Sequence, residues 1–370
     1  MYDINSIFRE YGESYRENKK LSIDQLKVME SIEACRTEKM NMHVQKCLAC
    51  EHTKTSYNSC RNRHCPKCQN ISKEEWVDAR KSELMNTHYF HVVFTVPEFL
   101  NNLFYLNKKT LYNLLFSCAS ETLLELSSDH KYIGAQIGIT TILHTWGQNL
   151  SYHPHLHCIV PGGGLSETSA EFKHSRKKFF LPVRVLSKKF RGKFLSMLCD
   201  MEKTSKITIP KDIDFIDLKE KSYNVDWVVY CKPPFKRPED VISYLGRYTH
   251  RVAISNNRIL SVKDDIVSFK WRDYKEKGRE KIMNLPVHEF IRRFLMHVLP
   301  AGFFKIRHYG ILSNRNKKTK LRLCQKLTGV KLTEIARLSR REIIEKLFGP
   351  DFFCCPLCGS EFISRSVLRE

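Results

Sequence analysis

The chain has 370 residues, and its 62 Lys and Arg outnumber its 40 Asp and Glu, which gives a formal net charge of +22. An apolar fraction of 42% is enough for a hydrophobic core, which excludes a wholly disordered chain. No uninterrupted apolar stretch is long enough to span a bilayer, and the chain begins with a polar segment, so we expect neither a membrane protein nor a secreted one. The excess positive charge favours nucleic acid as the partner.

Composition and pattern divide the chain into three predicted domains. Residues 1–72 combine a helical pattern with a Cys/His-rich segment. Residues 73–310 alternate strand-like runs with helical patterns, and residues 311–370 form a basic region with a short Cys-containing tail. Such an alternation of strands and helices is typical of an α+β protein.

Two Cys-x-x-Cys pairs in the first domain predict a structural zinc site. Cys47 and Cys50 form the first pair, and Cys65 and Cys68 form the second after a gap of fourteen residues. This spacing is typical of tetrahedral Zn²⁺ sites in a reducing compartment, and four thiolates leave no open position for catalysis. Between the pairs lie two further candidate ligands, Cys60 and His64, either of which could replace one cysteine.

Two histidines in a strand-like run predict a second kind of metal site. His155 and His157 alternate with Leu156, so both imidazoles lie on one face of the strand. Two such imidazoles can hold a divalent metal with positions open for a phosphate oxygen. A four-residue hairpin loop before this strand would place His144 opposite His157. We therefore expect His144 as the third ligand and Gln148 as the second choice.

A pair of tyrosines four residues apart is a candidate pair of nucleophiles. On a helix, Tyr244 and Tyr248 lie on one face one turn apart, and Arg247, His250 and Arg251 place positive charge beside them for a DNA phosphate. A phenol is a poor nucleophile near neutral pH unless a metal polarises the phosphate. The alternative interpretation is that both tyrosines simply pack the helix against a sheet.

The C-terminal region predicts a basic arm. Residues 315–341 contain ten Lys and Arg against one Glu, with aliphatic residues near helical spacing. The tail carries Cys354, Cys355 and Cys358. A single Cys-x-x-Cys pair is a weak metal signal, because it needs ligands from elsewhere in the chain or from a second subunit.

Taken in order, four motifs resemble one family. They are SCRNRHCPKCQ, HVVFTVP, HPHLHCIVPGGGL and YLGRYTHRVAISNNRI. From about residue 25 to about residue 310, the chain is similar to the rolling-circle transposases of the two-tyrosine HUH class, the insertion-sequence-ninety-one family. The resemblance implies an HUH endonuclease domain in which a central antiparallel sheet is flanked by helices, preceded by a zinc-binding module. It further implies Mg²⁺ or Mn²⁺ on His155 and His157, Tyr244 and Tyr248 as the two nucleophiles, and Zn²⁺ on Cys47, Cys50, Cys65 and Cys68.

The resemblance predicts a DNA transposase that nicks and joins single-stranded DNA at element ends and targets through a 5′-phosphotyrosine. We expect such a protein in the bacterial cytoplasm with the nucleoid, with self-association as a possible property. Two alternatives stay open. A plasmid replication initiator or a relaxase would use the same chemistry, whereas a non-catalytic zinc regulator would leave the histidines and tyrosines unexplained.

Overall fold

The computed structural model describes residues 2–176, 180–232, 235, 240–241, 244, 246, 249, 253–274, 276–330 and 337–368. Its longer helices are α1 (Ile4–Asn18), α2 (Ile23–Ala34), α3 (Gln69–Lys81), α4 (Asn101–Leu106), α5 (Lys108–Ser128), α6 (Val183–Lys203), α7 (Phe215–Asn224), α9 (Val287–Met296), α10 (Arg322–Leu327) and α11 (Arg340–Phe348). Its strands are β1 (Met42–Cys47), β2 (Thr53–Tyr57), β3 (Tyr89–Thr95), β4 (Gln136–Trp146), β5 (Tyr152–Pro161), β6 (Gly163–Leu165), β7 (Phe172–His174), β8 (Val229–Lys232), β9 (Ile259–Lys263), β10 (Ile266–Asp273), β11 (Arg279–Pro286), β12 (Ile306–Gly310) and β13 (Phe362–Leu368). Short 3₁₀ or π turns are η1 (Glu38–Met40), η2 (Glu98–Leu100), η3 (Asn256–Arg258), η4 (Asn314–Asn316), η5 (Lys317–Leu321) and η6 (Pro350–Phe353).

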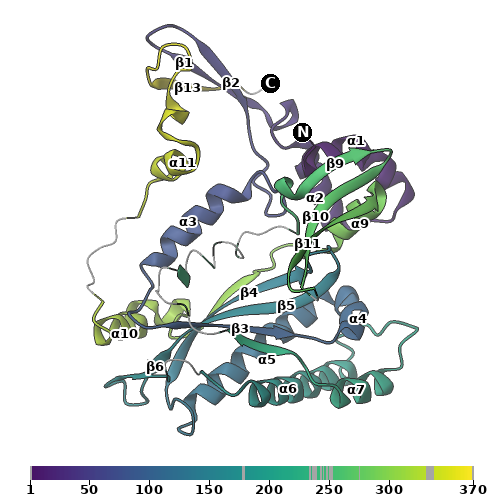
Figure 1. Cartoon of the computed structure of the whole chain (residues 1–370), viewed down its shortest axis with the longest axis vertical. Helices are drawn as coiled ribbons and strands as arrows, with labels where there is room; N and C mark the ends of the chain where they lie inside the picture. The colour runs from purple at the N-terminus through teal and green to yellow at the C-terminus, as the bar shows by residue number, and fades with distance from the viewer. Residues whose placement is uncertain are drawn as a thin grey trace.

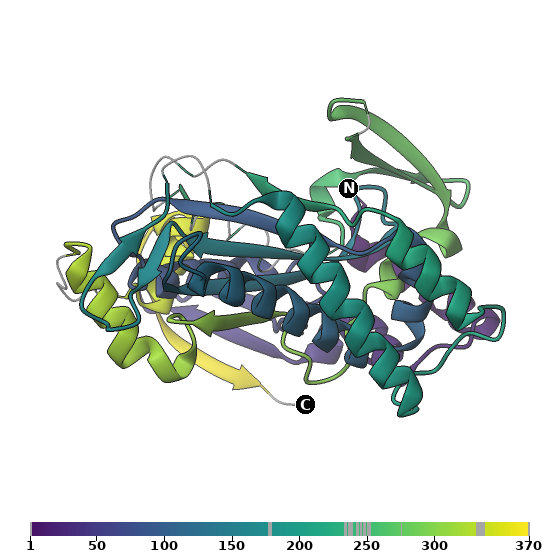
Figure 2. The same cartoon turned by 90° about the horizontal axis from the view of Figure 1, so that it is seen from below.

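A seven-stranded antiparallel sheet forms the centre of the molecule. Its strand order is β7-β6-β4-β5-β3-β8, and β12 pairs with β4. Helices α5, α6 and α7 lie along one side of this sheet (Figures 1 and 2). The predicted α+β class, with an antiparallel sheet flanked by helices, is therefore confirmed.

Alternation along the central strands separates two chemically different faces. Phe90, Val92 and Phe94 of β3, with Leu156 and Cys158 of β5, are buried in the main apolar core. Helices α5 and α6 contribute large apolar side chains to the same core. Because successive residues of a strand point to opposite faces, the residues between these apolar ones emerge on the other side of the sheet.

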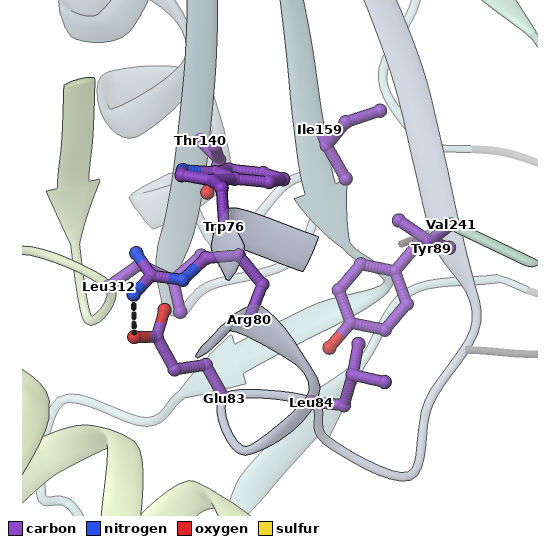
Figure 3. Close-up of a pocket in the computed structure, with 9 residues that line it drawn as sticks. All are labelled: Trp76, Arg80, Glu83, Leu84, Tyr89, Thr140, Ile159, Val241 and Leu312. Atoms are coloured by element: carbon purple, nitrogen blue, oxygen red, sulfur yellow. Dashed lines mark ion pairs between the residues drawn. The ribbon is translucent and has the colours of Figure 1, made fainter. Parts of the chain in front are cut away.

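Helix α3 lies over this second face (Figure 1). Trp76 and Arg80 of α3 line a small pocket above Tyr89, Thr140 and Ile159 of the sheet (Figure 3). An ion pair between Arg80 and Glu83, at 3.0 Å, closes one side of the pocket. Val77 of α3 packs in a buried apolar cluster with Tyr89 and Ile159, and this cluster fixes α3 on the face that also carries the histidines.

The N-terminal helices share an apolar core with segments much later in the chain. Ile4 and Phe8 of α1 belong to the same buried cluster as Phe290 and Phe294 of α9, and the rings of Phe8 and Phe294 are 5.2 Å apart. The three-stranded sheet β9-β10-β11 contributes to this cluster. The predicted domain limits at residues 72 and 310 stay predictions, and this core lies across the first of them.

The C-terminal tail returns to the N-terminal module. β13 pairs with β1 in a second three-stranded sheet of order β13-β1-β2, and α11 lies beside α3 (Figure 1). No helix in the described part of the chain has both the length and the apolar character needed to cross a membrane.

Candidate functional site

Three histidines from two neighbouring strands meet on the polar face of the central sheet. His144 of β4 is paired with His155 of β5, and Ile142 is paired with His157. The predicted register, with His144 opposite His157, is therefore wrong by two residues. The loop lies earlier in the chain than expected, because β4 ends at Trp146 and β5 begins at Tyr152, and the ladder shifts between His144 and Trp146. His144 nevertheless lies close to both other rings, with centroids 5.5 Å from His155 and 4.6 Å from His157.

The three histidines have the geometry of a metal site. One ligand nitrogen of each lies within 4.8 Å of the others. Burial lowers the pKa of His155 to about 4 and holds that of His157 well below its usual range. Both rings are therefore neutral near pH 7, which is the form that coordinates a metal. The donor set fits a divalent cation, and Gln148 instead donates from its amide to the hydroxyl of Tyr274 at 3.4 Å.

A backbone hydrogen bond orients His155. Its Nδ1 lies 2.7 Å from the carbonyl oxygen of His153. Because a carbonyl only accepts, Nδ1 carries the proton, and Nε2 is the nitrogen that would bind a metal. A metal-ligating histidine in proteins is usually held in this way by a backbone carbonyl or a carboxylate.

His91 of β3 connects the histidine group to the candidate nucleophile. Its Nε2 lies 2.8 Å from Nδ1 of His157, and the two rings stack with centroids 5.0 Å apart. Its Nδ1 lies 3.3 Å from the hydroxyl of Tyr244, in a helical segment above the sheet. Burial lowers the pKa of His91 to about 3, so this ring is neutral as well. Sequence reasoning missed His91, although it begins the HVVFTVP motif.

Four other predicted site residues lie outside the described part of the chain. They are Tyr248, Arg247, His250 and Arg251. Around Tyr244, the ring of Phe235 lies 5.0 Å away, and the ammonium of Lys232 lies 6.0 Å from the tyrosine ring centroid. A positive charge therefore lies close to the phenol.

The cysteines do not group as the sequence predicts. Cys47 and Cys50 lie apart from Cys65 and Cys68, so the single four-cysteine site does not form. Instead, Cys65 and Cys68 join Cys35 and Cys60 in one cluster, whereas Cys47 and Cys50 join Cys355 and Cys358 in another.

The physical reason lies in the intervening hairpin. Strands β1 and β2 carry the first Cys-x-x-Cys turn away from the start of α3, where the second pair lies. The alternative ligand Cys60 lies in the first cluster. His64 is not part of it: its side chain is half-buried, and its Nε2 accepts a 3.4 Å hydrogen bond from the backbone N–H of Leu299.

The Cys35 cluster fits a structural zinc ion. Its sulfur–sulfur distances are 3.5 Å for Cys35 and Cys68, 3.6 Å for Cys60 and Cys68, and 3.7 Å for Cys35 and Cys65. Four sulfurs about 2.3 Å from one tetrahedral Zn²⁺ are about 3.8 Å apart, which is close to this arrangement. The amide of Asn5 also donates to Cys65 at 3.7 Å, so the cluster lies against α1. Sequence reasoning missed Cys35 because it belongs to no Cys-x-x-Cys pair.

Comparison with known proteins agrees with both groups of residues. Residues 138–320 match a protein-family model described as a putative transposase, and residues 7–96 match one described as a transposase zinc-binding domain. The first range contains the three histidines and Tyr244, and the second contains the Cys35 cluster.

Two curated relatives cover most of the chain. It is 45% identical over 368 residues to the putative transposase y4qJ of Sinorhizobium fredii (strain NBRC 101917 / NGR234), which covers 96% of this chain and 92% of that protein. It is 26% identical over 325 residues to the transposase for insertion sequence element IS801 of Pseudomonas savastanoi pv. phaseolicola, which covers 86% and 78% respectively. No solved structure matches the chain.

Proposed function

Because this chain belongs to the insertion-sequence-ninety-one family of transposases, we propose that it cleaves and rejoins single-stranded DNA through a covalent bond to a tyrosine. The observation that carries the proposal is the continuous chain of contacts from Tyr244 through His91 to His157. The phenol of Tyr244, the proposed nucleophile, is thereby linked to a group of three imidazoles whose geometry suits a divalent metal.

In the proposed reaction, the hydroxyl oxygen of Tyr244 attacks a DNA phosphorus. A new oxygen–phosphorus bond forms, the bond to the 3′ oxygen breaks, and the products are a 5′-phosphotyrosine and a free 3′-hydroxyl. The phenol proton passes to a water molecule of the solvent, and the departing 3′ oxygen takes a proton from water. The phosphotyrosine keeps the bond energy of the broken linkage, so rejoining to another 3′-hydroxyl needs no ATP. A bound Mg²⁺ or Mn²⁺ would polarise the phosphate and stabilise charge on the leaving oxygen.

The hydrogen bonds suggest how the chain prepares the tyrosine. If Nε2 of His157 binds the metal, Nδ1 of His157 carries the proton and donates a hydrogen bond to Nε2 of His91. Neutral His91 then carries its proton on Nδ1 and donates to the oxygen of Tyr244. In this arrangement His91 is a positioning residue that stabilises negative charge on the attacking oxygen.

Tyr248 is proposed as the second nucleophile. A second tyrosine allows a second strand to be cut while the first stays attached, so donor and target ends can be exchanged. Arg247, His250 and Arg251 are proposed to contact the phosphates around the cleaved bond.

A row of exposed basic residues extends the proposed DNA contact. Arg315, Lys318, Arg322 and Lys326 lie three or four positions apart along η4, η5 and α10, and all four are exposed. Their spacing places them on one side of this helical segment. Lysine and arginine in such a row neutralise successive phosphates of a nucleic acid strand.

The proposed role is rolling-circle transposition of an insertion sequence, in the bacterial cytoplasm. A replication initiator or relaxase would share the chemistry, and the similarity to named transposases over most of the chain favours transposition. A non-catalytic zinc regulator would bind DNA but form no covalent product. The preference for single-stranded DNA at element ends and targets stays a prediction. Self-association of the protein stays a prediction as well.

Replacing the tyrosines tests the proposal. Labelled single strands that span the element's two boundaries are incubated with the protein and either Mg²⁺ or EDTA, and a denaturing gel shows any covalent adduct. We expect the double variant Tyr244→Phe/Tyr248→Phe to form none while it keeps its affinity for the strands. Tyr223→Phe is the matched control, because Tyr223 is exposed on α7, on the far side of the sheet. Adduct formation by the double variant at the wild-type level would contradict the proposal.

A further inference from the structure

A second group of four cysteines joins the N-terminal module to the C-terminal tail. Cys47 ends β1 and Cys50 lies in the turn between β1 and β2, whereas Cys355 and Cys358 lie before β13. The sulfur of Cys47 is 3.5 Å from that of Cys358, and the sulfur of Cys50 is 3.6 Å from that of Cys355. All four sulfurs lie within 4.8 Å of one another. This group supplies the partner ligands that the tail pair lacks in the sequence.

The two Cys-x-x-Cys turns have the same backbone hydrogen bonds. In the first turn, the N–H of Cys47 donates to the carbonyl of His52, and the N–H of Glu51 donates to the carbonyl of Cys47. In the second turn, Cys355 and Ser360 make the first of these bonds, and Gly359 and Cys355 make the other. The residue after the second cysteine is left-handed in both, with φ of 58° at Glu51 and 73° at Gly359.

Such a pair of facing turns suits one tetrahedral ion. The separations of 3.5 and 3.6 Å are close to the roughly 3.8 Å edge of a zinc–thiolate tetrahedron. Two separate disulfides would need each pair of sulfurs at about 2.0 Å and would not require four sulfurs to converge. Four thiolates in a tetrahedral arrangement are a usual ligand set of structural Zn²⁺.

Apart from the pairing of β13 with β1, the described tail residues make few buried contacts with the rest of the chain. Among the described residues of α11, only Ile343 is buried. Its ion pairs to α3, Lys346 with Glu74 and Arg340 with Glu75, involve exposed lysine and arginine side chains and stabilise little. The described residues of the tail thus lack an apolar core of their own, and a bound metal commonly replaces such a core in small segments.

We propose that Cys47, Cys50, Cys355 and Cys358 bind a second zinc ion, which fastens the C-terminal tail to the N-terminal module. The matched zinc-binding domain ends at residue 96 and so includes only half of this ligand set. The site keeps β13 beside β1 and α11 beside α3, and it fixes the far end of the basic C-terminal region. It is independent of the DNA chemistry proposed above.

Metal content of the full-length protein tests the site directly. We expect two zinc ions per chain in the wild type by elemental analysis, and one in Cys355→Ser/Cys358→Ser. Cys354→Ser is the matched control, because Cys354 is adjacent in sequence but outside the four-sulfur group, and it should keep two ions. A single zinc ion in the wild type, two ions in the double variant, or a metal other than zinc would overturn the proposal.

If the double variant does not fold, alkylation of the wild type tests whether the four cysteines bind zinc. Cys50 and Cys358 are exposed, so without a metal both should react readily with iodoacetamide. With zinc bound, we expect both thiols to react at least about tenfold more slowly. Both should become reactive together when a chelator removes the metal. Fast labelling of both before chelation, or a Cys47–Cys358 disulfide in the intact mass, would overturn the proposal.

Discussion

The hydroxyl of Tyr244 lies 3.3 Å from Nδ1 of His91. The other nitrogen of the same ring lies 2.8 Å from Nδ1 of His157, so one imidazole connects the proposed nucleophile to the face of the sheet that carries the three histidines. An apolar packing role for the tyrosine would not require this connection. The proposed chemistry depends on it.

Replacing the imidazole of His91 should slow the attack of Tyr244 on the DNA phosphate without removing any of the proposed metal ligands. We expect His91→Phe to lower the rate of adduct formation by about 10- to 100-fold, the usual cost of losing a hydrogen-bonding partner behind a metal ligand. Single-turnover kinetics with saturating Mn²⁺ measure the rate. His130→Phe, at an exposed position after α5, is the control. An unchanged rate in His91→Phe would mean that His91 only packs against its neighbours.

His144 and Gln148 compete as the third metal ligand, and the structure favours His144. We expect His144→Ala to weaken Mn²⁺ binding more than about tenfold, because it removes one of three converging imidazoles. Gln148→Ala should change the affinity less than about twofold, because its amide faces Tyr274. Calorimetric titration of each variant with Mn²⁺ gives the affinities, and the opposite ranking would exclude His144 as the third ligand.

Buried histidines should make the fold sensitive to acid. Burial lowers the pKa of His297 to about 3, whereas an unfolded histidine titrates near 6.5. Between these values the unfolded chain binds a proton that the native chain does not, so stability falls as the pH drops. At pH 5 this one group should cost about 2 kcal/mol of unfolding free energy relative to pH 7.5.

Urea unfolding of the wild type and His297→Gln at pH 7.5 and pH 5 measures this effect. The ring of His297 is held by Thr145 and by the carbonyl of Leu150, both at 3.2 Å. We expect the variant to be less stable at pH 7.5 and to lose less stability on acidification. Equal losses in the two proteins would show that His297 does not titrate in this range.

The exposed basic row should contribute to DNA affinity through salt-dependent contacts. Replacing Arg315, Lys318, Arg322 and Lys326 with alanine should reduce the slope of log affinity against log salt by up to about 3, since each contact to a single strand contributes about 0.7. Fluorescence anisotropy with a labelled single strand at several salt concentrations measures the slope.

A control with the same change of charge separates this row from bulk electrostatics. Arg184, Lys188, Lys203 and Lys206 are exposed on or beside α6, on the opposite side of the sheet. Alanine at these four positions should leave the slope nearly unchanged. Equal effects of the two quadruple variants would remove the row from the DNA contact surface.

Local patterns in the sequence are sufficient to predict the antiparallel sheet and most of the histidine site. Alternation along 153–161 correctly places His155 and His157 on one face, away from the buried Leu156. The register of His144 could not be obtained in this way, because the ladder shifts before Trp146 and the loop lies earlier in the chain than assumed. His91 was missed because one histidine in an apolar strand has no pattern that distinguishes it from a packed core residue.

The cysteine grouping shows the limit of spacing rules. Two Cys-x-x-Cys pairs close in sequence predicted one site, yet each pair finds its partners elsewhere. Cys65 and Cys68 meet Cys35 at the end of α2, and Cys47 meets Cys358 because β13 pairs with β1. That strand pairing joins segments about three hundred residues apart, and no local pattern in the sequence encodes it.

Identification of the residue joined to DNA tests the central claim most directly. The protein is incubated with Mg²⁺ and a single strand that contains an element boundary, the adduct is digested with protease and nuclease, and the modified peptide is sequenced by mass spectrometry. We expect a nucleotide on the hydroxyl of Tyr244 or Tyr248, present with Mg²⁺ and absent with EDTA. Cleaved DNA with no nucleotide on either tyrosine, or a nucleotide on another residue, would contradict the account.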